Sequence, residues 1–315
     1  MSDGDEAFDM ALKMRQWFLV PHAVSIPAID KLGPPYAQIA SAFQSNINGT
    51  ITVVSVPFAM AQANTSDRAF QRISTAERIR SGVRPKAGAE YDPQEHEAIN
   101  AAMLRAGSRF AEWYTSKAGH DELIRETSRY LIDAASHEQM GGAAAQLLLH
   151  GMSSLWTTFE VLARDLFEAR LNSHPQEAKR LIEQPDAKKR YERHLRFTLD
   201  DLASVGFDLS AQMGTYLTQM QDLSDFISVR AAFEALFPDR GLFANAATNK
   251  RLVTLNAQRH LIVHQGGRVD ARYQKATGSN APIGLRLEVT PEEFDLSLHA
   301  CVEVGNALLQ CIVEL

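Results

Sequence analysis

Apolar residues recur at helical spacing through most of the chain after residue 93. Pro93 begins a helix that is predicted to run to about residue 117, and another is predicted to begin at Asp121. The longest predicted helix covers residues 143–172, because its apolar positions follow one another in helical steps: Leu148, Leu155, Phe159, Leu162 and Leu166. Shorter helices are predicted over residues 186–204, 210–220 and 224–236.

Two further helices are predicted from their boundary residues. Thr248 or Asn249 is suited to cap the first, and two glycines, at positions 266 and 267, follow its expected end. The second begins with a capping box made by Thr290, Pro291 and Glu293. Between these helices, four apolar residues alternate with polar ones and predict a short strand or β-hairpin: Ile283, Leu285, Leu287 and Val289.

The first 140 residues have a less regular pattern. Residues 51–56 are mostly β-branched and favour either a strand or a buried helical turn. Residues 64–93 are polar and predict a linker with one short helix at 76–81. We therefore predict a mainly α-helical protein with a mostly helical N-terminal region of unassigned fold and function, residues 1–140, and a helical domain, residues 141–315.

Charge and composition restrict the function. The chain has 315 residues with 32 Lys and Arg against 38 Asp and Glu, a net charge of −6, which argues against nucleic-acid binding over the whole surface. Residues 175–275 are different, with 15 basic and 12 acidic groups. No secretory signal and no apolar run of about 20 residues is evident, so a cytoplasmic protein without a membrane partner is expected. Cys301 and Cys311 are expected to be reduced core residues, because about 15 Å of helix separates them.

The most informative polar residues lie in the helix that ends near residue 266. Arg259 falls in the middle of an apolar face that includes Leu255 and Ile262, where a guanidinium needs an anionic partner or ligand. His260 and His264 lie at the edge of this face, with His264 about 140° from Arg259 around the helix. One helix therefore does not hold a small anion between Arg259 and His264 unless its end unwinds or a second copy faces it.

Three interpretations of these residues remain open. In the first, Arg259 forms a buried ion pair with Glu160, and the histidines have no catalytic role. In the second, His260 and His264 bind a metal ion, although no third ligand is evident nearby. In the third, the site is a metal-independent phosphodiester site in which His264 moves a proton and Arg259 stabilises charge on the phosphate.

The spacing of these residues resembles a known motif. Four residues separate Arg259 from His264, and a polar residue, His260, follows the arginine. The motif continues as Gly266-Gly267-Arg268-Val269-Asp270-Ala271-Arg272-Tyr273. Together with residues 156–160, Asp165-Leu166 and residues 285–289, this pattern resembles the HEPN superfamily of prokaryotic ribonucleases and toxins over about residues 143–315.

The resemblance implies a bundle of four or five helices that forms a homodimer, with two motif helices facing each other across a cleft. It implies cleavage of RNA without metal or cofactor, leaving a 2′,3′-cyclic phosphate. Arg259 and His264 would take the catalytic positions, His260 the polar position beside the arginine, and Glu160 an accessory one. It also implies a toxin or an effector of antiviral defence in bacteria, with an antitoxin or another regulator as partner.

Residues that could bind the RNA lie in two places. Arg268, Arg272 and Tyr273 directly follow the motif. Lys189 and Arg193 belong to the densest basic run, for which a solvated helix face is the alternative. The function predicted from the sequence is thus a HEPN-type endoribonuclease; the alternatives are a non-catalytic HEPN module for dimerisation or partner binding, and a metal-dependent hydrolase that uses the two histidines.

Overall fold

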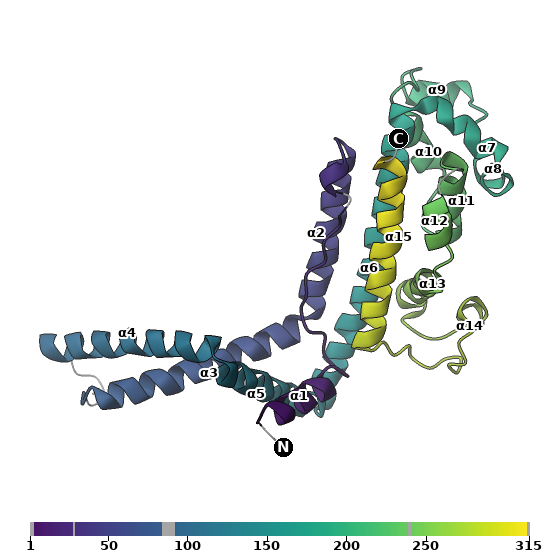
Figure 1. The fold of residues 1–315 in the computed structure, drawn as a ribbon. Helices are drawn as coiled ribbons and strands as arrows, with labels where there is room; N and C mark the ends of the chain where they lie inside the picture. The colour runs from purple at the N-terminus through teal and green to yellow at the C-terminus, as the bar shows by residue number, and fades with distance from the viewer. Residues whose placement is uncertain (1–2, 28, 84–91, 239–240, 314–315) are drawn as a thin grey trace. The chain divides into compact units, whose positions relative to one another are not determined.

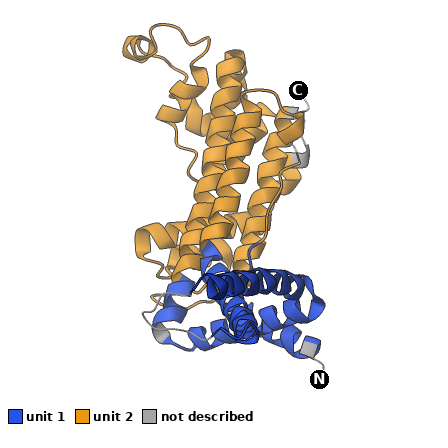
Figure 2. Cartoon of the chain, turned by 90° about the vertical axis from the view of Figure 1, so that its left-hand side faces the viewer, with its two compact units in different colours: residues 1–21, 54–145 blue, residues 22–53, 146–315 orange. Residues whose placement is uncertain are grey.

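The computed structural model describes residues 3–27, 29–83, 92–238 and 241–313, which form fifteen α-helices and two short 3-10 helices (Figure 1). The prediction of a mainly α-helical protein is confirmed. No helix in the described ranges has the length and apolar character needed to cross a membrane. The chain forms two compact units, residues 1–21 with 54–145 and residues 22–53 with 146–315 (Figure 2).

The first unit is built around helix–helix contacts of its longest helices. α3 packs on α4 and α5, and α1 packs on α5. One cluster of buried residues in this unit is Met14, Phe18, Ala61, Leu131 and Ala144. The helices of the unit are α1 (Asp3–Met14), α3 (Val56–Arg80), α4 (Pro93–Thr115), α5 (Lys117–Ala135) and the first residues of α6 (Glu138–Ser173).

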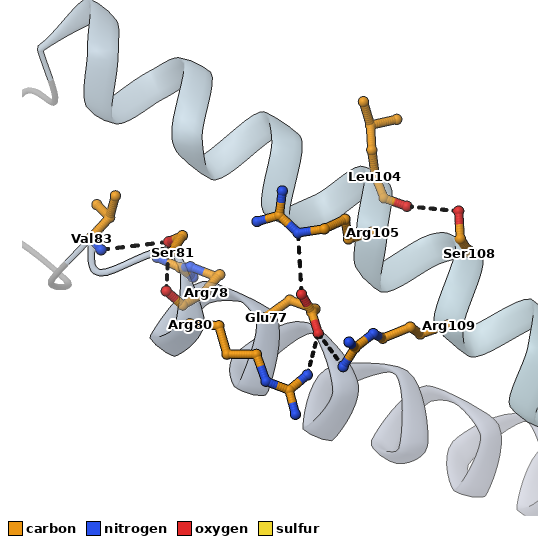
Figure 3. A network of polar contacts seen from close by, with 9 residues as sticks. All are labelled: Glu77, Arg78, Arg80, Ser81, Val83, Leu104, Arg105, Ser108 and Arg109. Atoms are coloured by element: carbon orange, nitrogen blue, oxygen red, sulfur yellow. Dashed lines mark hydrogen bonds and ion pairs between the residues drawn. The ribbon is translucent and has the colours of Figure 1, made fainter.

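A buried carboxylate joins α3 to α4 (Figure 3). The Glu77 side chain is only 2% exposed and lies 2.5 Å from Arg80, 2.6 Å from Arg109 and 3.3 Å from Arg105. A carboxylate removed from water is stable as an anion only when it is paired. The three guanidiniums satisfy this need and fix the register of the two helices at this turn.

The second unit is built on α6. Its predicted apolar face is buried, since Leu148, Leu155, Phe159, Leu162 and Leu166 are each at most 4% exposed. α2 (Tyr36–Val54) packs along it and hydrogen-bonds through Thr50 to Ser154 at 2.8 Å. α15 (Pro291–Val313) packs beside it with the thiol of Cys301 3.5 Å from the Leu155 carbonyl oxygen (Figure 1).

Shorter helices complete the second unit. Two of them contact aromatic residues of α6: Tyr191 stacks on Phe167 with ring centroids 5.7 Å apart, and Phe226 lies 6.2 Å from Phe159. The shorter elements are η1 (Ile29–Lys31), η2 (Pro175–Lys179), α7 (Arg180–Glu183), α8 (Pro185–Tyr191), α9 (Leu199–Ser204), α10 (Met213–Met220), α11 (Phe226–Leu236), α12 (Gly241–Ala246), α13 (Lys250–Gln265) and α14 (Ala271–Thr277).

Several predicted boundaries are confirmed. α6 ends at Ser173, before Pro175, and α13 begins after Asn249, whose side chain accepts a hydrogen bond from the Arg251 amide. At the start of α15, Thr290 and Glu293 cap each other's backbone amides at 3.1 Å. Both cysteines are buried and free, as expected.

Residues 51–54 end α2 and residue 56 begins α3, so the helical alternative for residues 51–56 is the one observed, with a turn at Ser55. Two predictions of local structure are wrong. The predicted linker is also helical as far as Arg80, since α4 and α5 cover α3 through small residues such as Ala69; residues 84–91 lie outside the described ranges. Residues 186–204 form two helices, α8 and α9, rather than one.

The predicted strand at residues 283–289 is wrong as well. The segment makes an isolated bridge between Arg268 and Arg286, with the Leu287 amide donating to the Gly267 carbonyl oxygen at 2.7 Å. Leu287 and Val289 are buried, but Ile283 and Leu285 are exposed, so the alternating pattern reflects two separate environments. The sequence analysis placed a boundary between two regions after residue 140. In the structure the second unit begins within α6, at Gln146, and also includes residues 22–53.

The close contact between α10 and α6 provides a test of this packing. A Cβ at Gly214 would lie 2.2 Å from the Glu168 carbonyl oxygen, so we expect Gly214→Ala to lower the free energy of unfolding by about 2 kcal/mol. Gly49→Ala in α2 is the control, because nothing lies near its Cβ and helix propensity should raise stability by about 0.5–1 kcal/mol. Urea unfolding followed by circular dichroism measures both; equal stabilities would contradict the close contact.

Candidate functional site

α13 presents the motif residues along one continuous helix. The helix stays regular to Gln265 and ends where Gly266 adopts the left-handed conformation at φ 59°. Its end therefore does not unwind to bring His264 closer to Arg259. The rings of His260 and His264 are adjacent, with centroids 4.8 Å apart.

Arg259 is only partly paired. Its side chain is 24% exposed, and its terminal nitrogen Nη2 lies 4.0 Å from a carboxylate oxygen of Glu160 on α6, longer than a hydrogen bond. Its Nε atom is buried without a hydrogen-bond partner. Burial raises the pKa of Glu160, although the Arg259 charge acts in the opposite direction. Arg259 thus has donor capacity that Glu160 does not use.

A pocket of about 590 Å³ opens beside the motif. It brings together side chains from four helices and the loops before them. The ionisable and aromatic residues that line it are Arg190, Asp225, Phe226, Arg259, His260, His264, Asp270, Arg272 and Tyr273. Three guanidiniums, two carboxylates and two imidazoles share this space, and such a combination is suited to an anionic ligand that exchanges protons.

His260 has an altered proton affinity in this pocket. Burial lowers its pKa, and the positive charge of Arg272 lowers it further, while Asp270 acts in the opposite direction. A histidine with a lowered pKa is mostly neutral at pH 7, so its ring can accept a proton.

Five of the residues expected from the sequence lie together in this pocket: Arg259, His260, His264, Arg272 and Tyr273. Tyr273 is only 6% exposed, and burial raises the pKa of its hydroxyl. It therefore contributes more to the wall of the pocket than to its open surface.

The other expected residues are not among those described as lining the pocket. Glu160 is on α6, with a carboxylate oxygen 4.0 Å from Nη2 of Arg259. Arg268 donates to the Gly284 carbonyl oxygen at 3.1 Å. Lys189 pairs with Asp186 at 3.1 Å, and Arg193 contacts His194 at 2.9 Å. These contacts direct the last three side chains to local partners.

Arg190 lines the pocket, although Lys189 and Arg193 were the residues selected from the same basic run in the sequence. It donates to the Ser228 hydroxyl at 2.7 Å and lies 3.8 Å from Asp225, the N-cap of α11. The periodicity of α8 contained the signal. Ala187 and Tyr191 are buried, and at 100° per residue Arg190 borders their face, whereas Lys189 points to the opposite side.

The described residues contain no group of three or more His, Cys, Asp or Glu side chains placed to hold a metal ion. His260 and His264 are thus two neighbouring imidazoles without a third such ligand in the described part of the pocket.

Comparison of the chain with protein-family models, with curated proteins and with solved structures found no match.

The proton affinity of His260 can be tested directly. We expect Arg272→Gln to raise its pKa toward the ordinary value of about 6.5, because a nearby positive charge is removed. NMR titration of the histidine ring protons measures this shift. Lys275→Gln, an equal charge change in the same helix, is the control and should leave it unchanged.

The same lowered pKa has a consequence for stability. The unfolded chain binds the His260 proton at a higher pH than the folded protein does. His260 therefore destabilises the folded state as the pH falls below about 6.5, and the effect is absent above that range. If NMR titration gave the same His260 pKa in the wild type and in Arg272→Gln, the proximity of the two side chains would be contradicted.

Proposed function

We propose that the chain is a metal-independent endoribonuclease of the HEPN type and that the pocket beside α13 is its active site. The observation that supports this most is the partly paired Arg259 beside two adjacent imidazoles. A guanidinium with unused donors is suited to the phosphate, and the imidazoles to the two proton transfers of the reaction. The resemblance of residues 259–273 to the HEPN motif supports the same activity.

The proposed reaction needs no kind of group beyond imidazole and guanidinium. Because Arg259 and His264 lie about 140° apart around a helix that stays regular, the groups that act on one phosphate come from two facing copies of α13, a composite site. One imidazole accepts the proton of the ribose 2′-hydroxyl, whose oxygen attacks the phosphorus. The bond from phosphorus to the 5′-oxygen breaks, and the other imidazole donates a proton to that leaving oxygen. The products are a 2′,3′-cyclic phosphate and a 5′-hydroxyl. The lowered pKa of His260 favours it as acceptor, which leaves His264 as donor.

Arg259 stabilises the charge that develops on the phosphate oxygens in this proposal. Arg190 and Arg272 add positive charge on other sides of the pocket, and each is suited to a phosphate of the substrate. A cytoplasmic toxin or defence effector, held inactive by a regulatory partner, is the biological role that the HEPN resemblance favours.

Cleavage of RNA in EDTA tests the activity. We expect the wild-type protein to cut RNA under chelation, and His264→Ala and Arg259→Ala to slow cleavage by at least about 100-fold. Denaturing gels measure the rate, and end-group analysis identifies the cyclic phosphate. His299→Ala and Arg251→Ala are controls, because these exposed residues are not among those described as lining the pocket.

The same assay separates the alternatives. Cleavage that requires added metal would favour a metal-dependent hydrolase. An inactive wild-type protein, together with an unstable Arg259→Ala variant, would favour an interaction module with a structural ion pair to Glu160. Arg190→Ala and Lys189→Ala remove the same charge from neighbouring residues, and only the first should weaken RNA binding if the pocket holds the substrate.

We further propose that the active form is a homodimer in which α13 faces its copy. Val263 on α13 is 51% exposed, and Leu285, which pairs with the segment after α13, is 58% exposed. Exposed apolar side chains close to a polar site are common at protein interfaces.

The dimer can be tested by charge insertion. We expect Val263→Asp and Leu285→Asp to give monomers at micromolar concentration and to abolish cleavage, because a carboxylate would be buried in the interface. Sedimentation velocity measures the assembly state. Leu104→Asp, at an exposed position of α4, should change neither property. A wild-type protein that stays monomeric under these conditions would refute the composite site.

A further inference from the structure

Two stretches of α3 and α4 that the proposed active site does not use are basic, although the two helices together also carry five acidic residues. Residues 68–80 of α3 contain four arginines and one acidic residue, and residues 102–111 of α4 contain two arginines and no acidic residue. The one acidic residue, Glu77, is buried. The exposed charge of these two stretches is therefore positive. We call it the α3–α4 basic surface: Arg68, Arg72, Arg78, Arg80, Arg105 and Arg109.

The arginines around Glu77 are held in place and still have unused donors (Figure 3). Each guanidinium has five N–H groups, whereas Arg80, Arg105 and Arg109 share the two oxygens of one carboxylate. Their side chains remain 57%, 51% and 50% exposed. Ordered guanidiniums with free donors bind phosphate groups well, because less conformational entropy is lost on binding.

Aromatic residues lie next along the same two helices. Phe70 of α3 meets Phe110 of α4 with ring centroids 5.5 Å apart, and Phe110 contacts Trp113 and Tyr114 at 5.6 and 5.8 Å. Tyr114 is 47% exposed and lies about 140° around α4 from Arg109, so a strand that contacts both residues bends around the helix. Basic residues beside exposed aromatic rings are typical of surfaces that bind single-stranded nucleic acid, since the bases stack on the rings.

A pocket of about 680 Å³ follows the aromatic cluster and is lined by residues of α3, α4 and α5. Arg72 donates to Glu122 at 2.8 Å, and the Trp113 indole donates to the same carboxylate at 3.0 Å. The hydrogen bond from Arg72 lowers the pKa of Glu122, so this carboxylate is ionised and paired. Glu126 and Asp133 also line the pocket, which makes it better suited to a neutral base than to a phosphate.

We propose that the α3–α4 basic surface binds single-stranded RNA. The guanidiniums around Glu77 hold phosphates, Tyr114 stacks on a base, and the pocket beside Trp113 admits another base. An acidic peptide would use the guanidiniums but would leave the aromatic rings and the pocket without a partner, so RNA fits the whole surface better. The ligand class is the one that the proposed function requires, but the site is a different one.

The test measures binding separately from cleavage. We use a fluorescein-labelled 2′-O-methyl oligonucleotide of about 12 nucleotides, which lacks the attacking hydroxyl and stays intact. Fluorescence anisotropy should show salt-dependent binding to the wild-type protein. Arg105→Gln combined with Arg109→Gln should weaken binding at least about tenfold and reduce the slope of log K against log salt by about 1.4, since each phosphate contact on a single strand contributes about 0.7.

A matched control removes the same charge elsewhere in the first unit. Lys13→Gln combined with Arg15→Gln changes two exposed residues at the end of α1 and just after it, and should alter the affinity less than about twofold. Tyr114→Ala should weaken binding about tenfold without changing the salt slope, because stacking involves no charge. Arg80→Gln serves in place of the double variant if circular dichroism shows that the latter is unfolded.

Several results would overturn the proposal. These are no binding by the wild-type protein, equal losses in the α1 control, or full competition by poly-glutamate of equal charge, which would indicate an acidic protein ligand. A lower melting temperature of the folded arginine variants without any change in affinity would make the cluster purely structural. Binding by a protein that cuts no RNA would leave this inference intact and refute only the proposed active site.

Discussion

The burial of one face of α6 is the constraint on which the second unit depends. α2 and α15 cover this face, and the aromatic residues Phe159 and Phe167 extend it to the shorter helices. Phe159 meets the first residue of α11, and Phe167 stacks on the last residue of α8. These two ring contacts determine where Arg190 and Asp225 enter the pocket. The polar site is thus positioned by apolar packing of neighbouring residues on the same short helices.

Arg259 and the three arginines around Glu77 are paired differently from ordinary surface ion pairs. Arg259 has a single long contact to Glu160, and three guanidiniums share the carboxylate of Glu77. Exposed one-to-one pairs, such as Lys189 with Asp186, leave little charge for a ligand. Around Glu77 the protein instead holds more positive charge than that carboxylate neutralises, and Arg259 keeps a buried donor without a partner; a net charge of −6 for the whole chain conceals both properties.

The sequence predicted those features that depend on local signals. The capping residues Asn249, Thr290 and Glu293, and the spacing of apolar residues in α6, are local, and they gave correct boundaries. Only the last turn of α3 was predicted as helix, because the preceding sequence is polar and its contacts with α4 and α5 are distant in sequence. The site was predicted in part: residues on α13 and α14 are close in sequence, whereas Arg190 joins them through tertiary packing. The periodicity of α8 indicates only that Arg190 borders a buried face, not which helices it meets there.

The order in which the chain is synthesised has a consequence for its folding. α2 belongs to the second unit, but residues 54–145 of the first unit follow it before any other part of the second. During synthesis its apolar side chains, including Phe43, Ile47 and Ile51, therefore stay unpacked until α6 and finally α15 have left the ribosome. Because transiently exposed apolar surface promotes aggregation, slower translation of residues 54–145 should lengthen the interval in which α2 can aggregate.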